Sequence, residues 1–234
     1  MLDSWLYTRL SSAKSSEGRP DSAQSARSNA KYEGVKSLVV CPLKIELRFL
    51  REALEQRGFK FTVIETKLGT VFESENFYLA VAGMGSQKFS EKLQRLLSLF
   101  DKVTNVISVG TAGALKSDLV VGDLVLPQEV ARYERLLNSA NFAFKIHRGE
   151  IICVDQPILS ERAKTELMKS TSAIAVTMEA PPDKSVIGER SFFEVRAVSD
   201  LANENVLTEF NAGLVIAMDH AAELIYRVFS QYKV

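Results

Sequence analysis

Three carboxylates stand where a predicted strand gives way to a helix or a loop. Glu179 follows the strand-like run "AVTM", Asp200 ends "VRAVSD", and Glu46 lies on the first turn of a predicted helix after "VKSLVVCPL". Taken singly, Asp200 has the ordinary role of a helix cap and Glu46 that of a solvated helix residue. In sheets of parallel strands, however, ligands bind beyond the carboxyl ends of the strands. The three carboxylates can therefore converge on one cleft.

Glycines follow two further strands of the predicted sheet. Gly83 and Gly85 lie in "VAGMGS", and Gly110 and Gly113 flank a threonine in "SVGTAGAL". Glycine adopts positive φ and lets the backbone approach a ligand, although most such glycines only turn the chain. Neither group fits the dinucleotide fingerprint, since Lys88 stands where a third glycine would be needed. We therefore expect a site without a Rossmann cofactor.

The segments around these residues alternate between strand and helix patterns. The alternation predicts an α/β fold, a single-domain three-layer sandwich around a central mixed, largely parallel sheet. Helices are predicted over 44–58, 86–100, 159–169 and 207–229. Strands are predicted at β-branched apolar runs over 35–41, 59–65, 77–83, 105–110, 122–131, 150–155, 173–178 and 192–200.

The domain is predicted to span residues 34–234. Residues 1–33 are rich in serine and poor in apolar side chains, which predicts a disordered or loosely attached tail because such a segment cannot bury enough surface to offset its ordering entropy.

Composition argues against several classes of partner. The 29 basic and 29 acidic side chains cancel, so neither a nucleic acid nor an anionic membrane is indicated as a partner. No apolar run approaches the ~20 residues that span a bilayer, and we expect a cytoplasmic protein. Cys41 and Cys153 lie in apolar runs and are interpreted as small core residues rather than a disulfide. His147 and His220 lack a Cys or His at ligand spacing, so we expect no metal and no cofactor.

Five motifs, in order from about Leu38 to Phe229, resemble the purine nucleoside phosphorylase and nucleosidase superfamily. "VGTAGALKSDLVVGDLVLPQEV" resembles its "GSAGGL…VGD" segment, "AVTMEA" its "VEMEA" motif and "VRAVSD" its "RAISD" motif. "VVCPLKIELRFL" is similar to the opening "IIGAMEEEVXXL" of 5′-methylthioadenosine/S-adenosylhomocysteine nucleosidases, whose "SGIGK" corresponds to "VAGMGS". The resemblance implies a nucleoside phosphorylase-like fold.

The resemblance also implies an enzyme that breaks the N-glycosidic bond of a purine nucleoside, adenosine-like and including nucleosides with a 5′-thio substituent. In the matching positions, Asp200 would donate a proton to purine N7 and Glu46 would hold and deprotonate the attacking water. Glu179 would accept hydrogen bonds from the ribose hydroxyls. Met178 would pack on the sugar. The other residues that the resemblance implies for substrate binding are Arg196, Ser199, Gly83, Gly110, Thr111 and Gly113. Arg196 would support the carboxylates, because on a strand it shares a face with Asp200.

Two alternatives to a hydrolase stay open. A phosphorylase would bind phosphate as its nucleophile, but Ser108 stands where bacterial hexameric phosphorylases have an arginine, and "CPLKIE" replaces their Gly-Asp-Pro loop. A degenerate homologue would bind a nucleoside without turnover. The family's purine-stacking Phe is missing near Pro157, the "VEM" glutamate is Thr177, and an aromatic near Leu207 is lost.

Members of the family form homo-oligomers, so we expect a dimer, although the segment between Tyr133 and Cys153 is short for the family.

Overall fold

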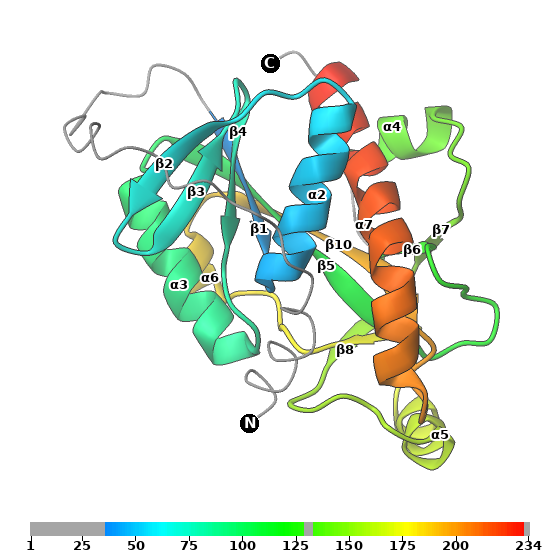
Figure 1. Cartoon of the computed structure of the whole chain (residues 1–234). Coiled ribbons are helices and arrows are strands. Elements are labelled where there is room, and N and C mark those ends of the chain that lie inside the picture. The colour runs from blue at the N-terminus through cyan, green and yellow to red at the C-terminus, as the bar shows by residue number, and fades with distance from the viewer. Residues whose placement is uncertain (1–35, 129–132, 232–234) are drawn as a thin grey trace. The chain divides into compact units, whose positions relative to one another are not determined.

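The computed structural model describes residues 36–128 and 133–231 (Figure 1). The predicted tail, residues 1–33, lies outside the described residues. In the described part of the chain, no helix combines the length and the apolar character needed to cross a bilayer.

Ten strands form one mixed sheet, and their order is β2-β3-β4-β1-β5-β10-β6-β7, with β9 paired to β5 and to β8. The strands are β1 (Lys36–Cys41), β2 (Thr62–Thr66), β3 (Gly69–Glu73), β4 (Phe77–Val81), β5 (Val103–Ala114), β6 (Leu124–Leu126), β7 (Ile146–Arg148), β8 (Ile151–Cys153), β9 (Ala175–Thr177) and β10 (Ser191–Asp200). The helices are α2 (Lys44–Gln56), α3 (Ser86–Leu99), α4 (Glu134–Ser139), α5 (Glu161–Ser170), α6 (Lys184–Ile187) and α7 (Val206–Gln231).

The centre of the sheet is parallel. β4, β1, β5 and β10 run side by side in one direction, whereas β2, β3 and β6 join antiparallel neighbours. The carboxyl ends of the four central strands therefore lie at one edge, where the predicted site residues occur. The predicted fold class is confirmed.

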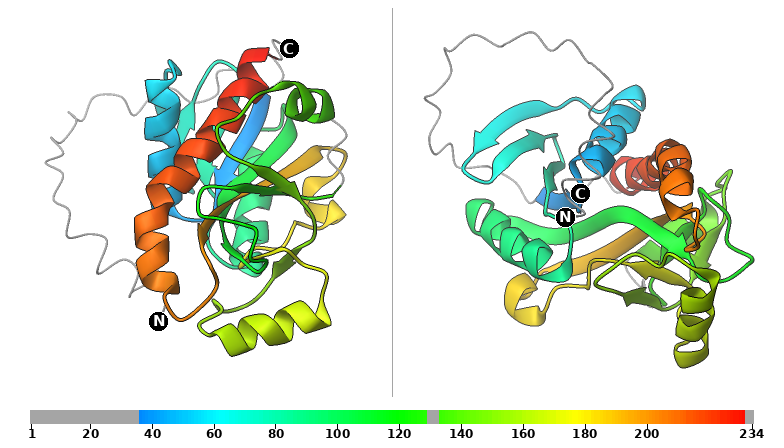
Figure 2. Two further views of the ribbon diagram at one scale, coloured as in Figure 1. Left: turned by 90° about the vertical axis from the view of Figure 1, so that its right-hand side faces the viewer. Right: turned by 60° about the horizontal axis from the view of Figure 1, so that its bottom comes forward.

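Helices cover both faces of this sheet, and α2, α3 and α7 each bury apolar side chains. α2 and α7 pack together on one face, and α3 and α6 lie on the other (Figure 2). Leu50 and Leu54 of α2 are fully buried in the same cluster as Leu224 and Ile225 of α7. Outside this cluster, Arg57 at the end of α2 forms ion pairs with Asp219 and Glu223 of α7, at 2.8 and 3.1 Å.

Helix α3 buries the residues that its periodicity predicts. Phe89, Leu93, Leu96 and Leu97 point inward and are at most 4% exposed. The helix begins after Gly85, whose φ of +86° is a conformation that glycine adopts without strain.

The long strand β5 reaches beyond the body of the sheet. Its first part pairs with β1 and β10, and its last residues, Gly113 and Ala114, pair antiparallel with Val176 and Ala175 of β9. The segment that follows β9 is thereby turned back toward the ends of the central strands. This turn brings Glu179 to the same edge as the other two carboxylates.

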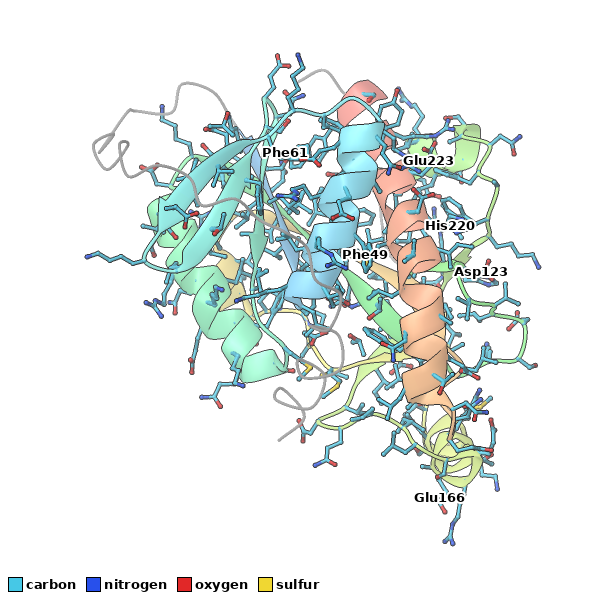
Figure 3. All side chains as sticks on the ribbon, viewed as in Figure 1. Phe49, Phe61, Asp123, Glu166, His220 and Glu223 are labelled. Atoms are coloured by element: carbon cyan, nitrogen blue, oxygen red, sulfur yellow. The ribbon has the colours of Figure 1, made fainter. Side chains whose placement is uncertain are left out.

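Gly122 and Asp123 form the turn before β6. Gly122 has a φ of +96°, and its carbonyl oxygen is 2.7 Å from Nδ1 of His220 on α7. The carboxylate of Asp123 accepts hydrogen bonds from the backbone N–H groups of Val120 and Lys145 and pairs with His147 at 2.9 Å. Figure 3 labels Asp123 and His220, on neighbouring elements well above α5, which carries Glu166. These histidines and Asp123 thus stabilise the connection into β6.

Some elements differ from the prediction. Strand β3 was not predicted, and it forms an antiparallel hairpin with β2. Strand β7 and the short helix α4 occupy the segment after Tyr133. Pro181 and Pro182 precede α6, whose N-cap is Asp183. Cys41 and Cys153 are free thiols, but only Cys41 is a core residue, since Cys153 is half-buried.

Candidate active site

Glu46 is buried at the start of α2 and is held by three hydrogen bonds. Its Oε1 accepts from the backbone N and from Oγ1 of Thr111, at 2.8 and 2.7 Å. Its Oε2 accepts from the backbone N of Leu43 at 2.9 Å, a contact that also caps the helix. The side chain is 2% exposed. Glu46 is therefore a fixed carboxyl group rather than a solvated helix residue.

Burial changes the acidity of Glu46. Loss of hydration and the nearby Glu179 raise its pKa from the ordinary value of 4.5 to about 7, against the opposing hydrogen bonds from Thr111 and Leu43. A carboxyl group with this pKa is poised to exchange a proton near neutral pH, which suits a general base.

Glu179 lies in the chain that leaves β9. Its Oε1 accepts a hydrogen bond from the backbone N of Gly85 at 3.2 Å, and its Oε2 accepts from Oγ1 of Thr177 at 3.1 Å. The residue is 4% exposed. A strand that ends here, followed by two prolines, thus places one oriented carboxylate against the start of α3.

Asp200 is the last residue of β10 and is 5% exposed. Its Oδ2 accepts a hydrogen bond from Oγ of Ser199 at 2.8 Å, and its Oδ1 accepts from the backbone N of Ala202 at 3.0 Å. Burial raises the pKa of this carboxyl group above its ordinary value, against those two hydrogen bonds. A raised pKa favours the protonated form, which a proton donor needs.

The end of β5 joins the three carboxylates into one cluster. Thr111 binds Glu46, Gly113 is the register partner of Asp200, and Gly113 also pairs with Val176, three residues before Glu179. Thr111 and Gly113 are two residues apart on a strand, about 7 Å. The structure therefore places Glu46 near Glu179, and it places Glu46 and Asp200 against neighbouring residues at the end of β5.

Two glycines pack tightly against predicted site residues. A Cβ on Gly113 would lie 2.9 Å from Oδ1 of Asp200, and a Cβ on Gly110 would lie 3.1 Å from Nη1 of Arg196. Gly83 has a φ of +101° and donates its backbone N–H to the carbonyl of Pro42 at 3.1 Å. The close contacts at Gly110 and Gly113 are with neighbouring protein groups, and the approach of backbone to a ligand stays a prediction.

Arg196 is placed differently from the prediction. Its Nη2 lies 3.0 Å from Oε1 of Glu194, and its Nη1 donates to Oγ of Ser108 at 3.1 Å. The two-residue alternation that would put Arg196 on the face of Asp200 is interrupted, because the β10–β5 register shifts between Val198 and Asp200. Arg196 therefore neutralises Glu194, whose pKa burial raises, rather than one of the three carboxylates.

Ser199 and Met178 complete the predicted set. Besides its bond to Asp200, the hydroxyl of Ser199 lies 3.4 Å from the carbonyl oxygen of Ala112. Met178 is half-buried, next to Glu179 in sequence.

Sequence reasoning missed the residues that hold Glu179 and its neighbours. Thr177 was noted only as a departure from the family motif, yet its hydroxyl orients Glu179. Ser86, at the start of α3, accepts from the backbone N of Ala180 at 2.9 Å and contacts Sγ of Cys153 at 3.1 Å. Ser86 follows the predicted glycine pair directly, which is the only signal that pointed to it.

Comparison with known proteins shows what this chain is similar to. Residues 36–144 match the family model described as the phosphorylase superfamily. The 5′-methylthioadenosine/S-adenosylhomocysteine nucleosidase of Bacillus licheniformis is 22% identical over 231 residues, which cover 84% of this chain and 99% of the relative. The corresponding nucleosidase of Buchnera aphidicola subsp. Schizaphis graminum is 21% identical over 220 residues, covering 80% of this chain and 93% of the relative.

Solved structures share the fold. The 5′-methylthioadenosine/S-adenosylhomocysteine nucleosidase from Neisseria meningitidis, in complex with methylthio-immucillin-A, has a TM-score of 0.67 at 22% identity, covering 84% of this chain and 99% of the other. Futalosine hydrolase of Helicobacter pylori has a TM-score of 0.66 at 20% identity, covering 83% of this chain and 97% of the other. The motifs of this chain, the match of residues 36–144 to the phosphorylase superfamily model and the shared fold all relate this chain to the same group of proteins.

Proposed function

We propose that this protein hydrolyses the N-glycosidic bond of a purine nucleoside and releases the free base. The observation that carries the proposal is the state of Glu46, a buried carboxyl group held by Thr111 and Leu43 with a pKa of about 7. Such a group takes a proton from water near neutral pH, whereas an ordinary surface carboxylate is too weak a base.

The three carboxylates divide the work of the reaction. The bond from C1′ to the purine breaks with its electron pair moving to the base, so the sugar gains positive charge and the base gains negative charge. Asp200, whose raised pKa favours the protonated form, donates its proton to purine N7. Glu46 accepts a proton from the water that attacks C1′, and Glu179 accepts hydrogen bonds from the ribose 2′ and 3′ hydroxyls.

Water is favoured over phosphate as the nucleophile by the surroundings of Ser108. This serine stands where hexameric phosphorylases have an arginine, is fully buried, and accepts a hydrogen bond from Arg196 at 3.1 Å. The guanidinium of Arg196 is itself paired with Glu194 at 3.0 Å. A phosphate ion would need cationic groups directed at it, and this buried cation already has its counterion.

The substrate class follows from the relatives. Several are called 5′-methylthioadenosine/S-adenosylhomocysteine nucleosidases and one solved structure is a futalosine hydrolase, so an adenosine-like nucleoside, including 5′-thio-substituted ones, is the first candidate. We further propose that the protein acts in the cytoplasm as a homodimer, as expected from the sequence.

The test is a base-release assay on a panel of nucleosides without phosphate. Methylthioadenosine, S-adenosylhomocysteine, futalosine, adenosine and inosine are each incubated with the protein, and free base is measured by chromatography. Release from at least one of them in phosphate-free buffer supports a hydrolase. Release only after phosphate is added would identify a phosphorylase, and binding without release would identify a nucleoside-binding homologue.

A further inference from the structure

The chain around Asp200 is held on both sides by α7. Oε2 of Glu209, in the first turn of α7, accepts a hydrogen bond from the backbone N of Leu201 at 2.8 Å. One turn further along, Gly213 faces the residue before Asp200, since a Cβ on Gly213 would lie 2.4 Å from the carbonyl oxygen of Ser199. Residues four apart share one face of a helix. A single face of α7 therefore fixes the backbone before and after Asp200.

Helix α5 holds the same peptide from another direction. Nζ of Lys164 donates to the carbonyl oxygen of Leu201 at 2.6 Å. The backbone N–H and carbonyl of Leu201 thus both bind charged side chains, one from α7 and one from α5. Charge-assisted hydrogen bonds of this kind are about twice as strong as neutral ones.

The turn that these contacts stabilise is strained. Ala202 has a φ of +51°, a left-handed conformation that residues other than glycine disfavour, and it is buried. In this conformation its backbone N–H reaches Oδ1 of Asp200 at 3.0 Å. Strain of this kind persists where surrounding contacts over-determine the backbone. The hydrogen bond to Asp200 therefore depends on the two helices that hold Leu201.

We propose that Lys164 and Glu209 are positioning residues for Asp200: they clamp the turn that orients its carboxyl group and act on that group with opposite charges. This inference rests on the proposed role of Asp200 as proton donor. Glu209 and Lys164 are the charged side chains with the largest effects on Asp200, and the hydrogen-bond donors to its carboxyl group are Ser199 and Ala202. Glu209 opposes ionisation of Asp200, and Lys164 favours it.

Because Lys164 and Glu209 carry opposite charges, removing each charge should shift the ionisation of Asp200 in opposite directions. Glu209→Gln retains an oxygen that accepts from Leu201 but removes the negative charge, so Asp200 should ionise at lower pH. Lys164→Gln removes the positive charge, so Asp200 should ionise at higher pH. Because a proton donor must be protonated, the alkaline limb of the kcat/KM profile should move to lower pH in Glu209→Gln and to higher pH in Lys164→Gln.

Matched controls make the same charge changes at exposed positions. Lys169→Gln changes an exposed lysine on α5, and Glu204→Gln changes an exposed glutamate in the turn before α7. Neither residue is among the groups with the largest effects on the pKa of Asp200, so their profiles should move less than those of Glu209→Gln and Lys164→Gln. A role in stability alone would lower the activity of Lys164→Gln and Glu209→Gln without moving their limbs in opposite directions.

A second measurement keeps the inference separate from the proposed function. The ionisation of Asp200 is followed in the ligand-free protein by carboxyl carbon NMR, with the resonance assigned by its loss in Asp200→Asn. Opposite shifts of this titration in Glu209→Gln and Lys164→Gln support the clamp, even if no nucleoside is hydrolysed. Shifts in the same direction, or shifts no larger than those of the control variants, would overturn it.

Discussion

Thr111 donates two hydrogen bonds to one oxygen of Glu46, from its backbone N at 2.8 Å and from its hydroxyl at 2.7 Å. Glu46 belongs to α2 and Thr111 to β5, so the predicted base is oriented by the strand at the centre of the sheet. These hydrogen bonds also lower the pKa that burial raises, which keeps Glu46 able to ionise near neutral pH.

Replacing Thr111 by valine should weaken the base. The variant keeps the side-chain shape and the backbone hydrogen bond but loses the hydroxyl, and a hydrogen bond to a charged group contributes about 1.5–3 kcal/mol. The pKa of Glu46 should rise, so the acid limb of kcat/KM should move to higher pH and activity at pH 7 should fall roughly tenfold. Thr111→Ser retains the hydroxyl and serves as the control. Equal pH profiles for the valine and serine variants would contradict this role.

Burial of Glu46 should make the protein less stable as pH rises. Its pKa of about 7 in the folded protein exceeds the ordinary value of 4.5, so the folded state binds more protons between these values. This contribution is favourable below pH 4.5 and is lost as pH rises through about 7, on the order of 3 kcal/mol in total. Glu46→Gln lacks this titration. The free energy of unfolding of the variant minus that of wild type should therefore be larger at pH 8 than at pH 4.5.

Urea unfolding of both proteins at these two pH values measures the effect. Glu194 and Asp200, whose pKa values are also raised, are present in both proteins and cancel in the comparison. The same pH dependence in both proteins would show that Glu46 ionises like an exposed carboxyl group.

Adding a methyl group at Gly113 should damage chemistry more than folding. The new Cβ would lie 2.9 Å from Oδ1 of Asp200 and 3.0 Å from Cβ of Ala202, so the carboxyl group must move. Overpacking of this kind costs about 1–3 kcal/mol of stability, while kcat should fall at least about tenfold because the proton donor is displaced. Gly58→Ala is the control, because Gly58 has a φ of +96° but no atom within 4 Å of an added Cβ. It should lose stability and keep its kcat.

Thr177 should affect substrate binding through Glu179. Thr177→Val removes the hydroxyl that donates to Oε2 of Glu179 but leaves the contact of Oε1 with Gly85. A carboxylate that is less well oriented should bind the ribose hydroxyls less tightly in both the ground and transition states, so kcat/KM should fall roughly tenfold, with a rise in KM. Steady-state kinetics of Thr177→Val and Thr177→Ser decide the matter, since the serine variant keeps the donor. A KM equal to that of wild type in the valine variant would count against the ribose-binding role of Glu179.

Much of the fold follows from sequence because the central elements have strong local patterns. α3 buries the predicted stripe, and the β-branched runs form the parallel centre of the sheet. β3 was missed because "GTVFE" is short and lies at the margin of the sheet, where burial is partial. Its pairing with β2 and β4, rather than its own composition, makes it a strand.

The sequence singles out the three carboxylates because they stand near strand ends, but it does not reveal their hydrogen-bond partners. The donor from Gly85 to Glu179 spans 94 residues of chain, and no local pattern encodes such a contact. Arg196 shows a different limit. Strand alternation predicts that Arg196 and Asp200 lie on the same face of β10. The register shift near Asp200 breaks this alternation, and the guanidinium pairs with Glu194 instead.

The most direct test of the proposed mechanism compares wild type and Asp200→Asn in phosphate-free buffer. Asparagine keeps the shape of the side chain and is as good a helix cap as aspartate, but it cannot donate the proton to purine N7. Release of free base from the preferred nucleoside should fall roughly 10²–10⁴-fold in kcat, about 3 to 5 kcal/mol, while the melting temperature shows that the fold is retained. Turnover close to that of wild type in Asp200→Asn would contradict the assignment of Asp200 as the acid and, with it, the proposed mechanism.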